Sequence, residues 1–240
     1  MTAGDWPACL DAYAHRLDEV ERMVAGCEAA GVSLFCAYYR RAMPKFRAVK
    51  ALLDDGAVGA PTRVSIRHAL PPPDDRSDLP WRLRPGAGEG GIFMDMGSHM
   101  IDLVQYLVGP ADLDTVAGEA RITVDYLEVP DTVTARFELA GESGSVPVDG
   151  AWCYVADTAE DRIAITGARG TLSFSVFDSA AIETEIDGRV TRHDAPHPDH
   201  VHQPMIAEIT QALLTGGDTV FAGREALRTA RVQAAILGAE

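Results

Sequence analysis

Alternation of apolar and polar residues from about residue 113 to 187 is the strongest constraint on the fold of this chain. Every second residue of 132–139 is apolar, and the same period returns at 163–165 and along 171–176. Period two is typical of strands with one buried face. Glycine-rich turns at 141–144 and 167–170 separate these runs, as in antiparallel hairpins. The region therefore predicts a largely antiparallel sheet.

Helical spacing of apolar residues flanks this region. It predicts helices over 18–30, 42–54, 203–214 and 223–237. Short strands are predicted over Val32–Tyr38 and Thr62–Ala69, and a long proline-rich loop over Leu70–Gly88. We predict an α+β fold with a mostly antiparallel sheet. No complete Rossmann domain is expected, because no Gly-x-Gly-x-x-Gly motif follows a predicted strand.

The overall charge restricts the classes of partner. The chain of 240 residues carries a net charge of −15. This balance argues against binding to nucleic-acid backbones and to anionic membrane surfaces. The amino-terminal residues do not resemble a secretory signal, and the four cysteines form no Cys-x-x-Cys pair, which favours a cytoplasmic protein with free thiols.

The stretch Gly90–Asp102 carries the clearest candidate chemistry. Asp95 and His99 are four residues apart, so a helix places them side by side, one turn apart. A carboxylate that orients an imidazole raises its basicity, and the pair is then a general base. Asp102 lies on the same flank and is a second candidate to orient His99. The alternative is a helix-start acid beside a histidine that packs in the core.

Four segments together resemble the Gfo/Idh/MocA family of sugar and polyol dehydrogenases. They occur in the order that the family has, over about residues 18–240: Ala37–Pro44, Asp54–Gly59, Gly90–Asp102 and Ile165–Leu172. The resemblance implies that Asp95 and His99 are the family's catalytic carboxylate and histidine. It also implies an open-faced, mostly antiparallel sheet with helices packed on one face. A small-molecule substrate and a homodimer formed through the sheet face are implied as well.

The same resemblance suggests that the cofactor domain is missing. The family's Glu-Lys-Pro tripeptide, whose lysine lies near the nicotinamide, would fall near residues 10–12, where Asp11 takes the place of the lysine. We therefore interpret residues 1–17 as a degenerate remnant of the cofactor domain and 18–240 as the substrate and dimerisation domain. No cofactor is expected to bind to this chain alone.

Further candidates surround this helix. Tyr38 and Arg40 follow a predicted strand and suit polyhydroxy or carboxylate ligands, although core packing explains Tyr38 equally well. Trp81 lies in the proline-rich loop and is expected either to cover the helix start or to anchor the loop. His200 is the candidate for a second polar group near the site. It belongs to a run with His193, His197 and His202 whose spacing matches no zinc signature, so no metal is expected.

Three hypotheses for the function follow. The first is a cofactor-independent acid–base enzyme, such as an isomerase, lyase or cyclase, in which His99 moves a proton. The second is the substrate-binding half of a split dehydrogenase, with a separate Rossmann subunit that holds NAD(P). The third is a non-catalytic binding or dimerisation module.

Overall fold

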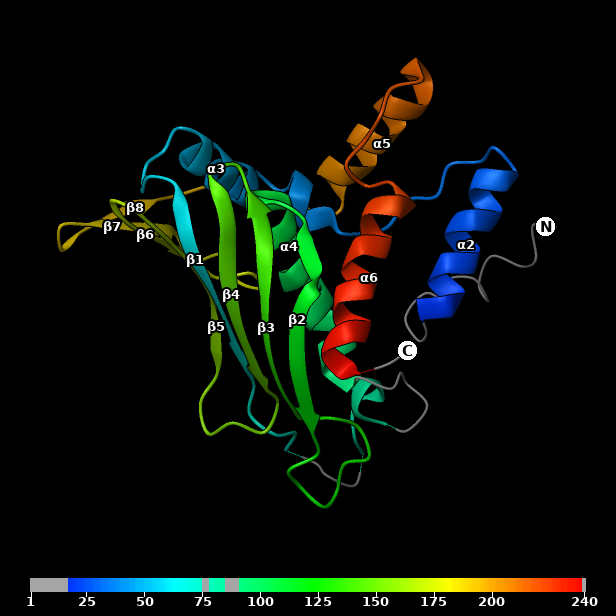
Figure 1. Cartoon of the computed structure of the whole chain (residues 1–240), viewed down its shortest axis with the longest axis horizontal. Coiled ribbons are helices and arrows are strands. Elements are labelled where there is room, and N and C mark those ends of the chain that lie inside the picture. Colours follow the sequence, from blue (N-terminus) through cyan, green and yellow to red (C-terminus); the bar gives the residue numbers. More distant parts are fainter. Residues whose placement is uncertain (1–16, 75–77, 85–90, 239–240) are drawn as a thin grey trace.

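A computed structural model describes residues 17–74, 78–84 and 91–238 of the chain. Its centre is one eight-stranded sheet with the strand order β2-β3-β4-β1-β5-β6-β7-β8 (Figure 1). The strands are β1 (Pro61–Ala69), β2 (Ala111–Arg121), β3 (Thr132–Gly141), β4 (Gly144–Cys153), β5 (Glu160–Gly167), β6 (Gly170–Phe174), β7 (Ile182–Ile186) and β8 (Arg189–His193). Only β1 and β4 pair in parallel, so the predicted α+β class with a mostly antiparallel sheet is confirmed.

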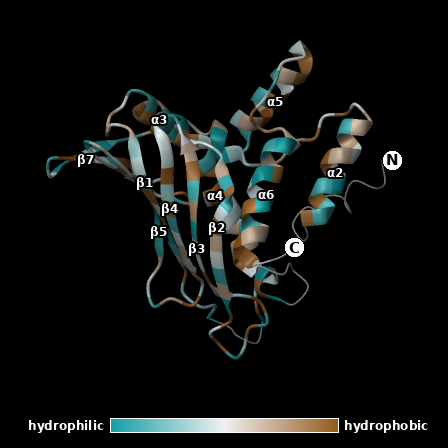
Figure 2. Cartoon of the chain, in the orientation of Figure 1, coloured by the Kyte–Doolittle hydropathy of each residue, from teal (hydrophilic) through white to brown (hydrophobic). Residues whose placement is uncertain are grey.

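Alternation along the strands gives the sheet one buried and one exposed face. In β3 the apolar residues Val133, Ala135, Phe137 and Leu139 are buried, and the residues between them are exposed. Figure 2 shows hydrophobic and hydrophilic residues interspersed along the strands in this way. The buried face needs a second layer to cover it.

Helices form that second layer. The helices are α2 (Leu17–Ala29), α3 (Pro44–Asp54), α4 (Ser98–Val108), α5 (Gln203–Thr215) and α6 (Gly223–Leu237). Side chains of α3, α4 and α6 join the strands in one core, for example Phe46, Leu103 and Ile236. Helix α2 packs against α6, while α5 projects from the body of the molecule (Figure 1). Within the described residues, no helix combines the length and apolar content that a bilayer crossing requires.

The structure departs from the prediction at Val32–Tyr38. Only Phe35 in this segment pairs as a strand, through an isolated antiparallel bridge to Ala222. The Cys36 amide donates to Phe221, and the Gly223 amide donates to Leu34. One edge of the segment is therefore paired. Along the other edge, the backbone groups of Ser33, Phe35 and Ala37 make no backbone hydrogen bond within the described part of the chain.

Two further departures concern the flanks of the site. The loop 70–88 contains a 3₁₀ turn, η2 (Trp81–Leu83), and β8 lies beyond the predicted sheet because its exposed residues show no clear apolar alternation. Asp11 and most of the interpreted remnant, residues 1–16, lie outside the described residues, as do 75–77 and 85–90.

Candidate active site

A π-helical turn shapes the start of the candidate site. This turn, η3 (Phe93–Gly97), leads directly into α4, and such turns are frequent at functional sites. From α6, the Gln233 side-chain amide donates hydrogen bonds to the carbonyls of Phe93 and Met94, at 3.1 and 3.2 Å. Gly97 is required here, since a Cβ at this position would lie 2.5 Å from the Phe93 ring. The turn contains Asp95, and His99 follows in the first turn of α4.

Asp95 pairs with an arginine of the proline-rich loop rather than with His99. Its carboxylate accepts a hydrogen bond from Arg82, and the Asp95 side chain is about one third exposed. The Arg82 guanidinium lies over the Trp81 ring, 4.7 Å from its centroid. The loop therefore contacts the helix start through Arg82, while Trp81 is 55% exposed.

His99 lies among aromatic rings. The ring centroids of Tyr38 and Tyr39 lie 5.5 and 5.7 Å from that of His99, both edge-on. The His99 Nδ1 atom is buried and has no hydrogen-bond partner. Burial, reinforced by the positive charge of Arg40, lowers the pKa of His99 to about 3. The imidazole is therefore neutral at pH 7 and has a lone pair that can accept a proton.

Asp102 does not orient His99, contrary to the sequence-based expectation. It is buried, and it accepts hydrogen bonds from Arg41 Nε at 2.9 Å and from Arg41 Nη2 at 2.6 Å. Thr229 donates to the same carboxylate at 3.4 Å. Burial raises the pKa of Asp102 to about 6, against the opposing effect of Arg41. The pair joins α4 to η1 (Tyr39–Ala42) and is structural.

Arg40 lies inside the molecule beside His99. It is 7% exposed, and its Nε donates to the Val176 carbonyl at 3.1 Å. Its guanidinium carbon lies 4.7 Å from the Tyr39 ring centroid and 4.5 Å from that of Phe177. The Arg40 Nη1 atom is buried without a partner. A buried donor in this state marks a place where a ligand or water is expected.

The sheet contributes three residues that sequence reasoning missed. His68 near the end of β1 pairs in register with Trp152 of β4, and Tyr154 follows β4. Each has a buried polar atom without a partner: His68 Nδ1, Trp152 Nε1 and Tyr154 Oη. Burial and the nearby charge of Asp95 raise the pKa of Tyr154 well above its usual value. The feature of the sequence that could have indicated these residues is the presence of polar side chains at the carboxyl ends of two buried strands.

The histidine run contributes His202 rather than His200. The His202 ring centroid lies 4.3 Å from that of Tyr39, and the charge of His202 acts on His99. His200 is exposed. His193 Nε2 forms a hydrogen bond with Thr184 Oγ1 at 2.9 Å. Among the described residues, no three His, Cys, Asp or Glu side chains are grouped so as to hold a metal ion.

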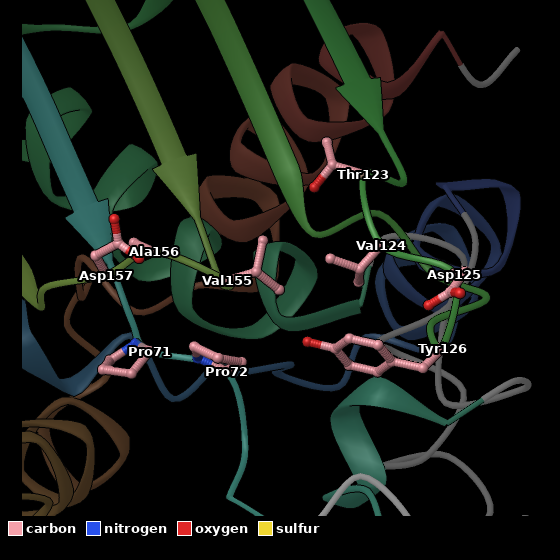
Figure 3. A pocket seen from close by; sticks show the side chains of 9 residues that line it. All are labelled: Pro71, Pro72, Thr123, Val124, Asp125, Tyr126, Val155, Ala156 and Asp157. Carbon is pink, nitrogen blue, oxygen red and sulfur yellow. The ribbon is translucent and has the colours of Figure 1, made fainter.

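A separate hollow of about 710 Å³ lies beside Tyr154, at the same ends of the strands (Figure 3). It is lined by Pro71, Pro72, Thr123, Val124, Asp125, Tyr126, Val155, Ala156 and Asp157. None of the predicted site residues lines it, so we place the chemistry at His99 and Arg40.

The described residues do not fit a nicotinamide dinucleotide. Such a cofactor is gripped at its pyrophosphate by a glycine-rich turn between a strand and a helix. Within 17–74, 78–84 and 91–238, no strand is followed by such a turn. The described residues provide the part of the candidate site that contains Arg40, His68 and His99.

The neutral His99 gives a prediction about stability and pH. Unfolded histidine has a pKa near 6.5, so the unfolded chain binds a proton between pH 6.5 and 3 that the folded chain does not. Stability is therefore fully present above pH 6.5 and is lost as the pH falls. At pH 5 the loss amounts to at most about 2 kcal/mol. Urea unfolding at pH 7 and 5 should show a smaller loss for His99→Gln than for wild type; equal losses would contradict the assigned protonation state.

The geometry above can be compared with known proteins. The family model described as the GFO/IDH/MocA C-terminal domain matches residues 46–173. D-apiose dehydrogenase of Paraburkholderia graminis is 31% identical over 99% of this chain and 65% of its own length. Myo-inositol 2-dehydrogenase of Thermotoga maritima is 27% identical over 72% of this chain and 50% of its own length.

A solved structure shares the fold. An oxidoreductase from Agrobacterium radiobacter, crystallised with NAD+, L-tartaric acid and magnesium, has a TM-score of 0.72 and 23% identity, covering 98% of this chain and 74% of that one. The first curated relatives are matched over 57% to 65% of their own length. Their names contradict our first hypothesis, a cofactor-independent acid–base enzyme, because the named relatives are redox enzymes.

Proposed function

Because this chain belongs to the GFO/IDH/MocA family through its C-terminal domain, we propose that it is the substrate-binding and proton-transferring part of an NAD(P)-dependent sugar or polyol dehydrogenase. The observation that carries the proposal is a neutral, half-buried His99 whose Nδ1 atom has no partner, together with unpartnered buried polar atoms of Arg40, His68 and Tyr154. Polar atoms that converge in this way suit a ligand with several hydroxyl groups. The relatives named after sugars and inositol support the same substrate class.

In this proposal the chain binds the substrate and moves a proton. The hydroxyl to be oxidised must lose its proton, and the lone pair of His99 accepts it. Asp95 holds Arg82 at the helix start, which keeps the loop against the site. The dinucleotide is held outside the described residues, so we assign no part of its binding to them.

The partly paired segment 33–37 favours one docking place for a dinucleotide-binding partner. In the described part of the chain, the backbone groups of Ser33, Phe35 and Ala37 lack backbone partners, and an unpaired strand edge is where another strand adds. We propose that the dinucleotide-binding unit, a separate Rossmann subunit in the split arrangement, docks along this edge. The homodimer through the exposed sheet face stays a prediction; light scattering that gives a monomer at micromolar concentration would contradict it.

The test uses the protein purified with a tag from its source organism, together with whatever chains remain bound. We expect reduction of NAD+ or NADP+ that depends on a sugar or polyol, and calorimetric binding of the same compound. Conversion of the sugar without any change in the redox state of nicotinamide would contradict the proposal. So would the failure of every sugar and polyol in the panel to bind.

A further inference from the structure

We infer that the substrate carries a single carboxylate and that Arg40 is the residue that binds it. The inference rests on the proposed function and narrows its substrate from sugars and polyols in general to polyhydroxy monocarboxylates, the class of the sugar acids. It depends on three properties of Arg40: its burial, its unused donor and the lack of a carboxylate in direct contact with it.

The Arg40 side chain is held by several contacts, and one of its two terminal nitrogens is left without an acceptor. Its Nε is committed to the Val176 carbonyl, and its two faces are covered by Tyr39 and Phe177. The remaining Nη1 atom is buried and has no acceptor. Leaving a buried charged donor unsatisfied costs about 1–3 kcal/mol or more, so a stable fold retains it only where something else supplies the acceptor.

Arg40 has no direct ion-pair partner in the described part of the chain. Among the described residues, no carboxylate lies within 4 Å of its guanidinium. Two acids, Asp161 and Asp95, act on its charge only from further away. Asp161 accepts hydrogen bonds from the backbone amides of Val176 and Phe177, at 2.6–3.0 Å, and Asp95 pairs with Arg82.

The other cations near the site are balanced. Arg41 pairs with Asp102, and Lys45 donates to Ser175 Oγ at 2.8 Å and lies 3.7 Å from Asp178. Arg40 is therefore the cation near the site that has no carboxylate in direct contact among the described residues. A carboxylate brings one negative charge and matches it, whereas a phosphate monoester brings nearly two at pH 7.

The surroundings of Arg40 suit a hydroxylated chain attached to that carboxylate. The Phe177 ring that covers Arg40 lies 4.8 Å, between centroids, from His68, and His68 lies 5.7 Å from Tyr154. The unpartnered atoms of His68 and Tyr154 thus continue from Arg40 along the sheet. The charge of Arg40 acts on both His68 and His99, which places it between the sheet side and the helix side of the site.

The test compares matched ligands by calorimetry on the full chain. Alditols of four to six carbons are paired with the aldonates of the same length, for example D-glucitol with D-gluconate, and D-glucitol 6-phosphate is the phosphate arm. We expect wild type to bind an aldonate about 10–100-fold more tightly than its alditol, the effect of one charge-assisted hydrogen bond. Arg40→Met should remove this preference and change alditol affinity little.

Two further variants complete the design. Arg192→Met removes an arginine that is 76% exposed and should leave the preference intact. Arg40→Lys retains the charge without the guanidinium fork, so a reduced preference is expected, and it replaces Arg40→Met if that variant does not fold. Equal affinity for aldonates and alditols in wild type, an unchanged preference in Arg40→Met, or tighter binding of the phosphate would overturn the inference while leaving the proposed function. Failure of every compound to bind would instead reject the proposed function itself.

Discussion

Replacing His99 with glutamine is expected to lower kcat of the proposed dehydrogenase about 10²–10⁴-fold, the usual contribution of a positioned general base. Glutamine is polar and similar in size, but it cannot accept a proton at neutral pH. The substrate hydroxyl would then have to lose its proton to water. Initial rates of nicotinamide reduction at saturating substrate measure the effect.

The control distinguishes loss of the base from loss of structure. His200→Gln changes an exposed histidine of the same chain and should retain wild-type kcat. Calorimetric titration of the substrate into His99→Gln should give a dissociation constant close to that of wild type, because His99 acts by accepting the proton during the reaction and not by holding the substrate. A His99→Gln enzyme with full kcat would remove His99 from the mechanism.

Much of the fold was predictable because alternation and helical spacing report burial directly. β3 and α6 are clear cases: the apolar residues of 132–139 form the inner face of a strand, and α6 covers Gly223–Leu237 as the periodicity predicts. The segment at Val32–Tyr38 was not predictable in the same way. Its residues favour a strand, but a strand also requires partners, and here only Phe35 finds one.

The site was less predictable than the fold, since spacing along the chain does not fix pairing in space. A separation of four residues predicts that Asp95 and His99 pair, but the Asp95 carboxylate accepts a hydrogen bond from Arg82 of the loop instead. His68 and Tyr154 were missed because a polar residue at a strand end has no local pattern that distinguishes packing from binding. The His202 ring packs against Tyr39, and His200 does not. The local sequence around the two histidines does not reveal this difference.

Among the substitutions considered, removal of the Asp102 carboxylate is expected to give the largest loss in the free energy of unfolding. Asp102→Leu would remove both hydrogen bonds that the carboxylate accepts from Arg41, which is 4% exposed, and would leave this arginine only the more distant Glu225, at 3.9 Å. Breaking one side of a buried ion pair costs about 3–5 kcal/mol, a large share of a typical unfolding free energy. Urea unfolding at pH 7 measures the change.

A second substitution tests whether the cost comes from the stranded charge. In Arg41→Met/Asp102→Leu both charges are replaced by apolar groups, so most of the lost free energy of unfolding should return. Asp78→Ala serves as the control, because it breaks an exposed ion pair with Arg84 and should leave stability near that of wild type. If the double variant were as unstable as Asp102→Leu alone, the loss would come from packing around α4. Recovery would instead identify the charge of Arg41 as the source of the loss. A buried arginine would then need a carboxylate partner, which Asp102 supplies to Arg41 and which a ligand would supply to Arg40.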